Sequence, residues 1–293
     1  MRLVCLLLAL LTALTGSAAA MELTEDTLYD PIPLRGAAPY KPHEKCFLPD
    51  QSGYRDESLE ITVETFRRHD TAIMAVRVSI QDSSQLRTAM AARPPSRKTV
   101  VVSTMAKKNN AVLAINGDYF NYHEKGLVVR GGKLYRNQLN GRRDVLIIDT
   151  EGDFTILRRC EKDDFQRYAE NTLHAFSFGP GLVINGQIPP DLGGTEVDNA
   201  PEKPTQRIAI GQTGYLEYLI IATEGPENKG STGLTIDQMA ELCREMGCIN
   251  AYNLDGGSSS TIVLHNRKIN ALSTGKVRPV GDCIYFATLI PDE

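Results

Sequence analysis

Several features that would assign a function directly are missing from this sequence. It has no C-x-x-C pair and no H-E-x-x-H, and its five histidines are scattered, so we expect no zinc site built from these residue types. No block of lysine and arginine stands out and the formal net charge is −4, which argues against nucleic acid and against a membrane surface as partners. After the first twenty residues, no stretch approaches the ~18 uninterrupted apolar residues of a transmembrane helix.

The first twenty residues form a unit of their own. Arg2 gives a short positive start, residues 3–14 are almost wholly apolar, and alanines at 18–20 provide the small side chains of a cleavage site. This pattern is typical of a secretory signal peptide, and the apolar run is too short for a membrane span. We therefore expect cleavage near Ala20 and a secreted or extracytoplasmic mature protein.

Five cysteines follow the predicted cleavage site: Cys46, Cys160, Cys243, Cys248 and Cys283. Export permits disulfides, but an odd count leaves at least one thiol unpaired or intermolecular. Such residues more commonly behave as small buried hydrophobic side chains. The sequence leaves the pairing and the oligomeric state open.

The rest of the chain divides into a lead-in and one domain. Residues 21–57 carry five prolines without a sustained hydrophobic period, which predicts an extended segment before a domain at 58–293. Alternating, β-branched runs predominate in that domain and predict strands. Hairpin turns are predicted at 151–152, 185–186 and 213–214.

Two helices are expected within the domain. Ser96 is placed to cap a helix over about 98–109, and Thr235 with Gln238 forms a capping box before an amphipathic segment that ends at Gly247. The predicted fold is α+β, a single domain with a mixed, largely antiparallel sheet flanked by these two principal helices.

The segment 250–263, NAYNLDGGSSSTIV, ends an apolar strand in an acid and then continues with five small residues. A similar ending follows the earlier run AVLAI, where Asn116 and Asp118 occupy the places that Asn253 and Asp255 have in the later segment. Each of the two strands follows a predicted helix. If the strands are neighbours in a sheet, their polar ends meet in one crevice.

Asp255 is the residue with the clearest chemical potential. Its carboxylate suits an acid, a base or a nucleophile, while Gly256 and Gly257 allow backbone N–H groups to approach an anionic oxygen. Ser258 adds a hydroxyl without bulk. The alternative is a plain turn in which the carboxylate accepts hydrogen bonds from its neighbours, although such a turn seldom needs five small residues.

Two further groups extend this hypothesis. Asp118 lies beside Tyr119 and Phe120, and an acid next to aromatic rings suits a sugar, whereas aromatic packing in the core is the alternative. Arg207 opens the strand-like run RIAIGQ and points away from the side of Ile208. There it is either solvated or clamps a phosphate or carboxylate.

Five segments taken together resemble the phosphodiester glycosidase family, in the family's order and over roughly residues 58–290. They are AINGDYF, SFGPGLVINGQ, RIAIGQ, GLTIDQMAELCREMGCINAYNLDGGSSS and VRPVGDCIYF. The resemblance implies hydrolysis of a sugar-1-phosphodiester, such as an N-acetylglucosamine-1-phosphodiester, to free sugar and a phosphomonoester. No cofactor and no metal are expected.

The resemblance also suggests roles for individual residues. Asp255 is expected to act at the anomeric carbon, and Arg207 at the leaving phosphate together with backbone donors. Many relatives carry glycine where Asp118 stands, so the resemblance does not make Asp118 an obligatory catalyst. The candidate catalytic residues are Asp255, Asp118 and Arg207, and the candidate substrate-binding residues are Asn116, Asn253, Gly256, Gly257, Ser258 and Phe120.

Two other classes of protein remain as alternatives. A non-catalytic carbohydrate-binding module of the cell envelope would use the same amides and aromatic rings. A cation-stabilised adhesion domain is less favoured, because no run has EF-hand or repeat-type ligand spacing. We expect a bacterial setting, since the chain lacks the extra modules and membrane anchor expected of an animal member, and substrates among the phosphodiester-linked sugars of envelopes or exopolysaccharides.

Overall fold

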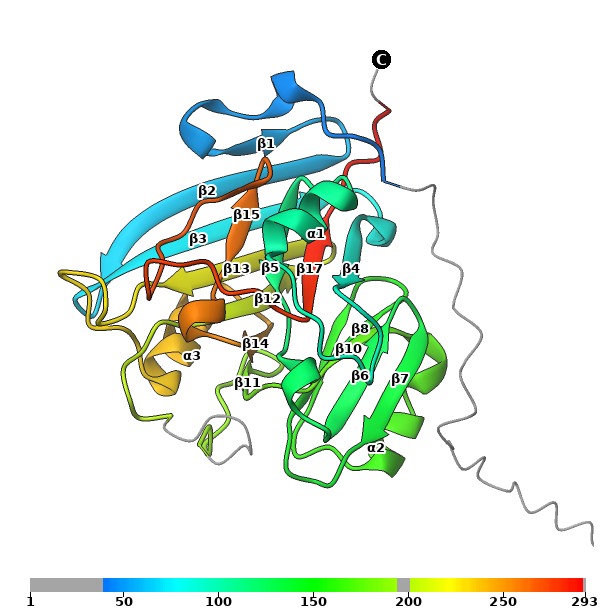
Figure 1. Cartoon of the computed structure of the whole chain (residues 1–293). Coiled ribbons are helices and arrows are strands. Elements are labelled where there is room, and N and C mark those ends of the chain that lie inside the picture. The colour runs from blue at the N-terminus through cyan, green and yellow to red at the C-terminus, as the bar shows by residue number, and fades with distance from the viewer. Residues whose placement is uncertain (1–38, 194–200, 292–293) are drawn as a thin grey trace, which may run out of the picture.

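The computed structural model describes residues 39–193 and 201–291. These residues form three β-sheets, three α-helices and several short 3-10 turns (Figure 1). The expected signal peptide at 1–20 and the start of the expected lead-in lie outside the described residues. Residues 39–57, also in that lead-in, include a strand that pairs with the next one and the fully buried side chain of Tyr54.

The largest sheet has seven strands in the order β1–β2–β3–β13–β12–β14–β11. Its strands span Gly53–Arg55 (β1), Leu59–Arg68 (β2), Thr71–Ile80 (β3), Gly181–Val183 (β11), Ile208–Gly214 (β12), Glu217–Thr223 (β13) and Asn250–Leu254 (β14). The long β2–β3 hairpin is the one that the alternating pattern predicts.

Two five-stranded sheets complete the fold, with the orders β16–β15–β5–β17–β4 and β7–β6–β10–β8–β9. The first has Leu86–Met90 (β4), Leu113–Asn116 (β5), Ile262–Leu264 (β15), Arg267–Lys268 (β16) and Asp282–Phe286 (β17). The second has Gly126–Arg130 (β6), Lys133–Gln138 (β7), Val145–Asp149 (β8), Phe154–Leu157 (β9) and Thr172–Phe176 (β10).

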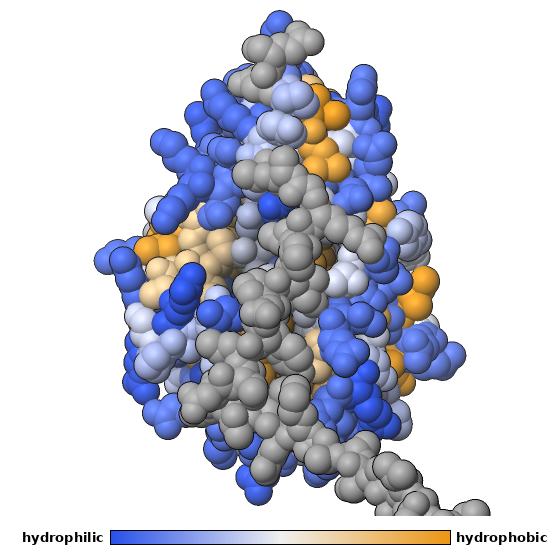
Figure 2. Space-filling view, turned by 90° about the vertical axis from the view of Figure 1, so that its right-hand side faces the viewer, coloured by the Kyte–Doolittle hydropathy of each residue, from blue (hydrophilic) through white to orange (hydrophobic). Residues whose placement is uncertain are grey.

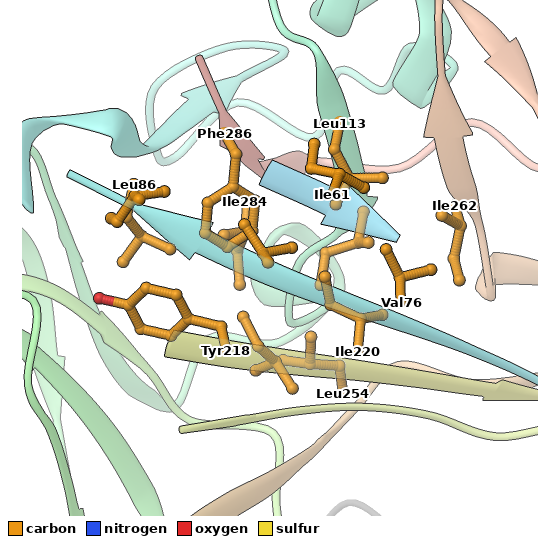
Figure 3. Close-up of a cluster of buried hydrophobic side chains, with 14 of the residues drawn as sticks. Ile61, Val76, Leu86, Leu113, Tyr218, Ile220, Leu254, Ile262, Ile284 and Phe286 are labelled. Carbon is orange, nitrogen blue, oxygen red and sulfur yellow. The ribbon is translucent and has the colours of Figure 1, made fainter. Parts of the chain in front are cut away.

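The main hydrophobic core lies between the inner faces of these sheets (Figure 3). Ile61, Val76 and Ile220 come from the seven-stranded sheet, and Leu113 and Phe286 come from the sheet opposite. All five are essentially inaccessible to solvent. Full burial of such a side chain is worth about 1.5–3 kcal/mol. Burial at every second residue explains why the alternating runs form strands with one face inward.

Each helix covers a different sheet. α3, Ile236–Glu245, packs on the outer face of the seven-stranded sheet, and α1, Val102–Lys108, packs on the sheet that contains β5. The short α2, Lys162–Gln166, packs through Phe165 against the third sheet. α3 begins with the predicted capping box of Thr235 and Gln238.

The predicted, largely antiparallel pairing is confirmed, but the predicted single mixed sheet flanked by two helices is wrong. The described residues form three sheets, and every strand pair within them is antiparallel. A hydrophobic pattern identifies a strand but not its partner, so alternation alone does not divide strands among sheets. β13 and β14, which α3 connects along the chain, run in the same direction. They do not pair with each other, because β12 lies between them and pairs antiparallel with both.

Two local predictions also change. α1 begins after Val101, which provides no side-chain cap, so Ser96 is not its cap. The β12–β13 hairpin turns at Tyr215 and Leu216, two residues beyond the predicted turn, because Gly214 still pairs with Glu217. The predicted turns at 151–152 and 185–186 are present.

On the face shown in Figure 2, hydrophilic residues predominate and the visible hydrophobic ones form small, separate patches. Within the described ranges, none of the helices combines the length and the apolar character needed to cross a bilayer.

Candidate active site

The two Asn-x-Asp segments meet, but across two sheets. β14 ends at Leu254 in the seven-stranded sheet, and the loop 255–261 then enters β15, which pairs with β5 in the neighbouring sheet. The buried side chain of Asn116, at the end of β5, joins both ends of this loop. Its Nδ2 donates to the carbonyl of Asp255 at 2.8 Å, and its Oδ1 accepts from the amide of Thr261 at 3.0 Å. Asn116 therefore positions the loop that carries Asp255.

The carboxyl group of Asp255 is held in a desolvated position. Its Oδ2 is buried and has no hydrogen-bond partner among the described residues. Burial raises the pKa of Asp255 to about 6, and the charges of Asp118 and Asp282 act in the same direction. The Ser259 hydroxyl and the charge of Arg278 act in the opposite direction. A carboxyl group with this pKa is mostly ionised at neutral pH and takes up a proton when the pH falls toward 6.

The glycines after Asp255 allow a close approach of two backbone segments. A Cβ on Gly256 would lie 2.6 Å from the carbonyl oxygen of Gln206, so that no larger residue fits without movement. The amide of Gly257 donates to the same carbonyl at 2.8 Å. The Gly257 N–H is thus already used within the fold, whereas the sequence predicts backbone donors for a bound anion here. These glycines fix the loop against the start of β12.

Arg207 binds backbone carbonyls of nearby loops. Its Nε donates to Leu234 at 2.7 Å, and its Nη2 lies 3.3 Å from the carbonyl of Pro201 and 3.2 Å from that of Lys203. Its side chain is buried. These bonds fasten the chain around 201–205 and the segment before α3 to the start of β12. These contacts give Arg207 a role in holding this loop, and the phosphate clamp expected of it stays a prediction.

Arg278 is the cation whose charge acts on Asp255. Its Nη2 donates to the Tyr119 hydroxyl at 3.1 Å, and its Nη1 lies 3.4 Å from Oγ of Ser258. The guanidinium also lies over the rings of Tyr119 and Tyr122, 5.1 and 5.6 Å from their centroids. A half-buried guanidinium beside a desolvated carboxylate suits a substrate that carries a negative charge next to the reacting carbon.

Two stacked tyrosines border this carboxylate–guanidinium pair. The rings of Tyr119 and Tyr122 are 4.4 Å apart and nearly parallel, and Tyr122 is 42% exposed. Tyr119 has φ of 63° and ψ of 20°, a left-handed conformation that is uncommon for a residue with a bulky side chain. Such conformations persist where the surroundings impose them, and they cluster at functional sites. The exposed ring of Tyr122 offers a stacking surface for a sugar.

Asp118 is part of a buried ion-pair network. Its Oδ1 accepts from Arg130 at 3.1 Å, and its Oδ2 accepts from the amide of Ser177 at 2.9 Å. The same guanidinium binds Asp282 at 2.6 Å and lies 3.8 Å from the centroid of the Phe176 ring. Because both oxygens of Asp118 are engaged, the structure gives it a positioning role and not that of a free catalytic acid. Breaking such a pair typically costs about 3–5 kcal/mol.

Asp282 explains why glycine stands at position 117. A Cβ on Gly117 would lie 2.1 Å from Oδ1 of Asp282, and the Gly117 amide donates to the carbonyl of Asp282 at 3.1 Å. Burial raises the pKa of Asp282 to about 6, whereas the charge of Arg130 acts in the opposite direction. The network beneath the candidate site therefore contains a second readily protonated carboxyl group.

The two remaining substrate-binding candidates, Asn253 and Phe120, make contacts away from Asp255 and Arg278. The Nδ2 of Asn253 donates to the carbonyl of Gly179 at 2.8 Å, and its buried Oδ1 has no partner among the described residues. Phe120 is buried and lines a cavity of which Asp255 is not part. Tyr119, one residue earlier, is the aromatic residue beside Arg278. The predicted role for Phe120 is thus better filled by its neighbour.

Sequence reasoning missed Arg278 and Asp282, although both lie in the quoted segment VRPVGDCIYF. The sequence signal for a charged site was an arginine and an acid four residues apart, at the entry to the last strand, β17. β17 pairs with β5 so that Cys283 lies opposite Asn116, which brings this turn to the end of β5. Among the described residues, no group of three or more His, Cys, Asp and Glu side chains is arranged to hold a metal ion.

The site thus combines a desolvated carboxylate, a guanidinium and the exposed ring of Tyr122. A family model for phosphodiester glycosidase matches residues 109–287, which include every residue of this set. The chain belongs to the phosphodiester glycosidase family.

Other similarities agree with this assignment. An uncharacterized SPbeta prophage-derived protein of Bacillus subtilis, YomE, is 31% identical over 204 residues. The match covers 68% of this chain and 30% of the relative, so the chain spans less than a third of that protein's length.

Two solved structures share the fold. A hypothetical protein from Synechocystis gives a TM-score of 0.65 at 15% identity, over 79% of this chain and 62% of the other. The catalytic domain of zebrafish N-acetylglucosamine-1-phosphodiester alpha-N-acetylglucosaminidase, auto-inhibited by its pro-peptide, gives 0.63 at 16% identity, over 85% and 87%. At these identities the likeness concerns the fold alone.

Proposed function

We propose that this chain hydrolyses a sugar-1-phosphodiester, releasing the sugar and leaving a phosphomonoester on the other alcohol. The observation that supports this most strongly is the carboxyl group of Asp255. Its Oδ2 is buried and lacks a hydrogen-bond partner among the described residues, and the charge of Arg278 acts on the group. An enzyme tolerates a buried unpaired carboxylate oxygen where that oxygen has a reacting partner to meet.

The reaction divides between these two groups. The bond between the anomeric carbon and the phosphate oxygen breaks, and the phosphate leaves with the electron pair. Ionised Asp255 stabilises the positive charge that develops on the sugar, or attacks the carbon directly. Arg278 stabilises the leaving phosphate. Water then supplies a hydroxyl to the anomeric carbon, and its proton goes to the phosphomonoester or to solvent.

A phosphomonoester is a good leaving group, so the reaction needs little help from a general acid. This fits the surroundings of Asp255, where the nearest other acids, Asp118 and Asp282, are bound to Arg130. The sugar face is expected to stack on the rings of Tyr119 and Tyr122, since the latter is exposed to a ligand.

The setting is part of the same proposal. The apolar first twenty residues suggest export, and exported enzymes of this specificity would meet phosphodiester-linked sugars of cell envelopes or exopolysaccharides. An N-acetylglucosamine-1-phosphodiester is the first substrate to test.

The test is a panel of sugar-1-phosphodiesters, with an ordinary O-glycoside of the same sugar as the control substrate. We expect turnover of at least one phosphodiester and none of the O-glycoside, and loss of that turnover in Asp255→Asn. Sugar binding without product across the whole panel would instead favour a non-catalytic carbohydrate-binding module. Full turnover by a folded Asp255→Asn variant would remove Asp255 from the mechanism.

A further inference from the structure

A cavity of about 660 Å³ lies on the other side of the turn that carries the stacked tyrosines. The turn Phe120–Tyr122 separates the two regions, since Tyr119 contacts Arg278 whereas Phe120 and the residue after it line the cavity. The opposite walls come from residues 94–97 and from β7. Among the lining residues are Arg97, Phe120, Asn121, Lys125, Tyr135 and Arg136.

Arg136 has only one edge of its guanidinium engaged. Its Nη1 donates to the carbonyls of Phe120 and His123, which holds the turn in place. Its Nε and Nη2 are buried and have no hydrogen-bond partner among the described residues. These two adjacent N–H groups form the edge that binds two oxygens of a carboxylate or phosphate side by side.

The charges around Arg136 do not neutralise it by direct contact. Burial lowers the pKa of Arg136; the charges of Asp118 and Glu124 raise it, and those of Arg143 and Arg130 lower it further. Asp118 is already bound by Arg130, and Glu124 lies 3.5 Å from Arg97 at the exposed rim. A guanidinium whose Nε and Nη2 are buried without a partner gains from an added anion.

Asn121 provides a second unsatisfied group in the same wall. Its side chain is only 6% exposed, yet neither Oδ1 nor Nδ2 has a partner among the described residues. The backbone at Gly281 is packed against it, since a Cβ there would lie 2.5 Å from Oδ1 of Asn121. Buried amides are almost always hydrogen-bonded, so one without a partner in the protein is left to bind water or a ligand group.

We propose that this cavity is a subsite for an oxyanion, phosphate or carboxylate, carried by a sugar unit other than the one at Asp255. Arg136 and Asn121 bind the anion, Arg97 and Lys125 add positive charge at the rim, and the partly exposed ring of Tyr135 contacts the sugar. The assignment rests on the proposed function, because it makes the substrate an anionic glycan that extends across the tyrosine turn.

The test measures binding and not turnover, so it is informative even if no phosphodiester is hydrolysed. Full-length Asp255→Asn protein is titrated by calorimetry with glucose 6-phosphate, glucuronic acid and neutral glucose. We expect at least one of the two acids to bind about tenfold or more tightly than glucose. The better of the two acids identifies the anion as phosphate or carboxylate.

Two substitutions in that background locate the site. Arg136→Met is expected to abolish the preference for the acid, and Arg142→Met, at an exposed arginine outside the cavity, is expected to keep it. Asn121→Asp retains the shape of the side chain and adds a negative charge, so it tests the site even if Arg136→Met does not fold. Equal affinity for glucose and both acids, or a preference unchanged in folded Arg136→Met or Asn121→Asp, would overturn the proposal.

Discussion

Replacing the candidate catalytic carboxylate is expected to stabilise the protein while it destroys the activity. Folding raises the pKa of Asp255 from 3.8 to about 6, mainly through burial. The folded state therefore holds this proton more tightly than the unfolded state does. The resulting stability is fully present below about pH 4 and is lost as the pH rises through 6.

The size of the effect follows from the same numbers. Each pKa unit corresponds to about 1.4 kcal/mol, so the ionised carboxylate costs up to about 3 kcal/mol at neutral pH. Asp255→Asn removes this cost. At pH 7.5 we expect a gain of about 2–3 kcal/mol in the free energy of unfolding, or roughly 4–10 °C in Tm for a domain of this size.

The assay is thermal unfolding of both proteins between pH 4 and pH 8. The gain is expected to shrink toward zero at pH 4, where the wild-type carboxyl is protonated in the folded state. Asp70→Asn is the matched control, because Asp70 is exposed in the β2–β3 turn, where asparagine is equally suited to the positive φ. An unchanged or lower Tm at pH 7.5, or a gain that persists at pH 4, would refute the desolvated state of Asp255.

Three other substitutions test the parts around this carboxylate. Arg278→Met is expected to lower kcat/KM about 100-fold or more with little change in Tm, and full activity would exclude Arg278 from the phosphate site. Gly117→Ala places a methyl group against the carboxylate of Asp282 and is expected to lower the free energy of unfolding by about 3 kcal/mol or more. A wild-type Tm would contradict that packing. Asn116→Ala removes the side chain that binds the backbone at both ends of the Asp255 loop. We expect denaturant unfolding to show a free energy of unfolding that is lower by about 2–4 kcal/mol. Wild-type stability would rule out this role of Asn116.

The local parts of the fold were predictable because their causes are local. The capping box at Thr235 and the alternation in β2 and β3 act within a few residues, and the structure contains each of them. The repeated Asn-x-Asp ending also predicted that Asn116 lies near the Asp255 loop. The prediction assumed neighbouring strands of one sheet, whereas β5 and β14 belong to two different sheets. The division into three sheets depends on pairings between distant strands, which the alternation pattern does not encode.

The identity of the cation was not predictable for a related reason. Arg207 directly precedes β12 beside the Asp255 loop, and its long side chain extends to the carbonyls of Leu234 and Lys203. Arg278 reaches the site because β17 pairs with β5, some 170 residues earlier in the chain. Which of two arginines lies near enough for its charge to act on a carboxylate is decided by side-chain direction and non-local pairing, and a motif encodes neither.

The most direct test of the central claim is to find which bond is cleaved, by hydrolysing the best sugar-1-phosphodiester of the panel in water enriched in oxygen-18. Attack at the anomeric carbon predicts the label in the released sugar and none in the phosphomonoester, as read by mass spectrometry and phosphorus NMR. Label in the phosphomonoester would mean attack at phosphorus, and Asp255 would then not act on the sugar as proposed.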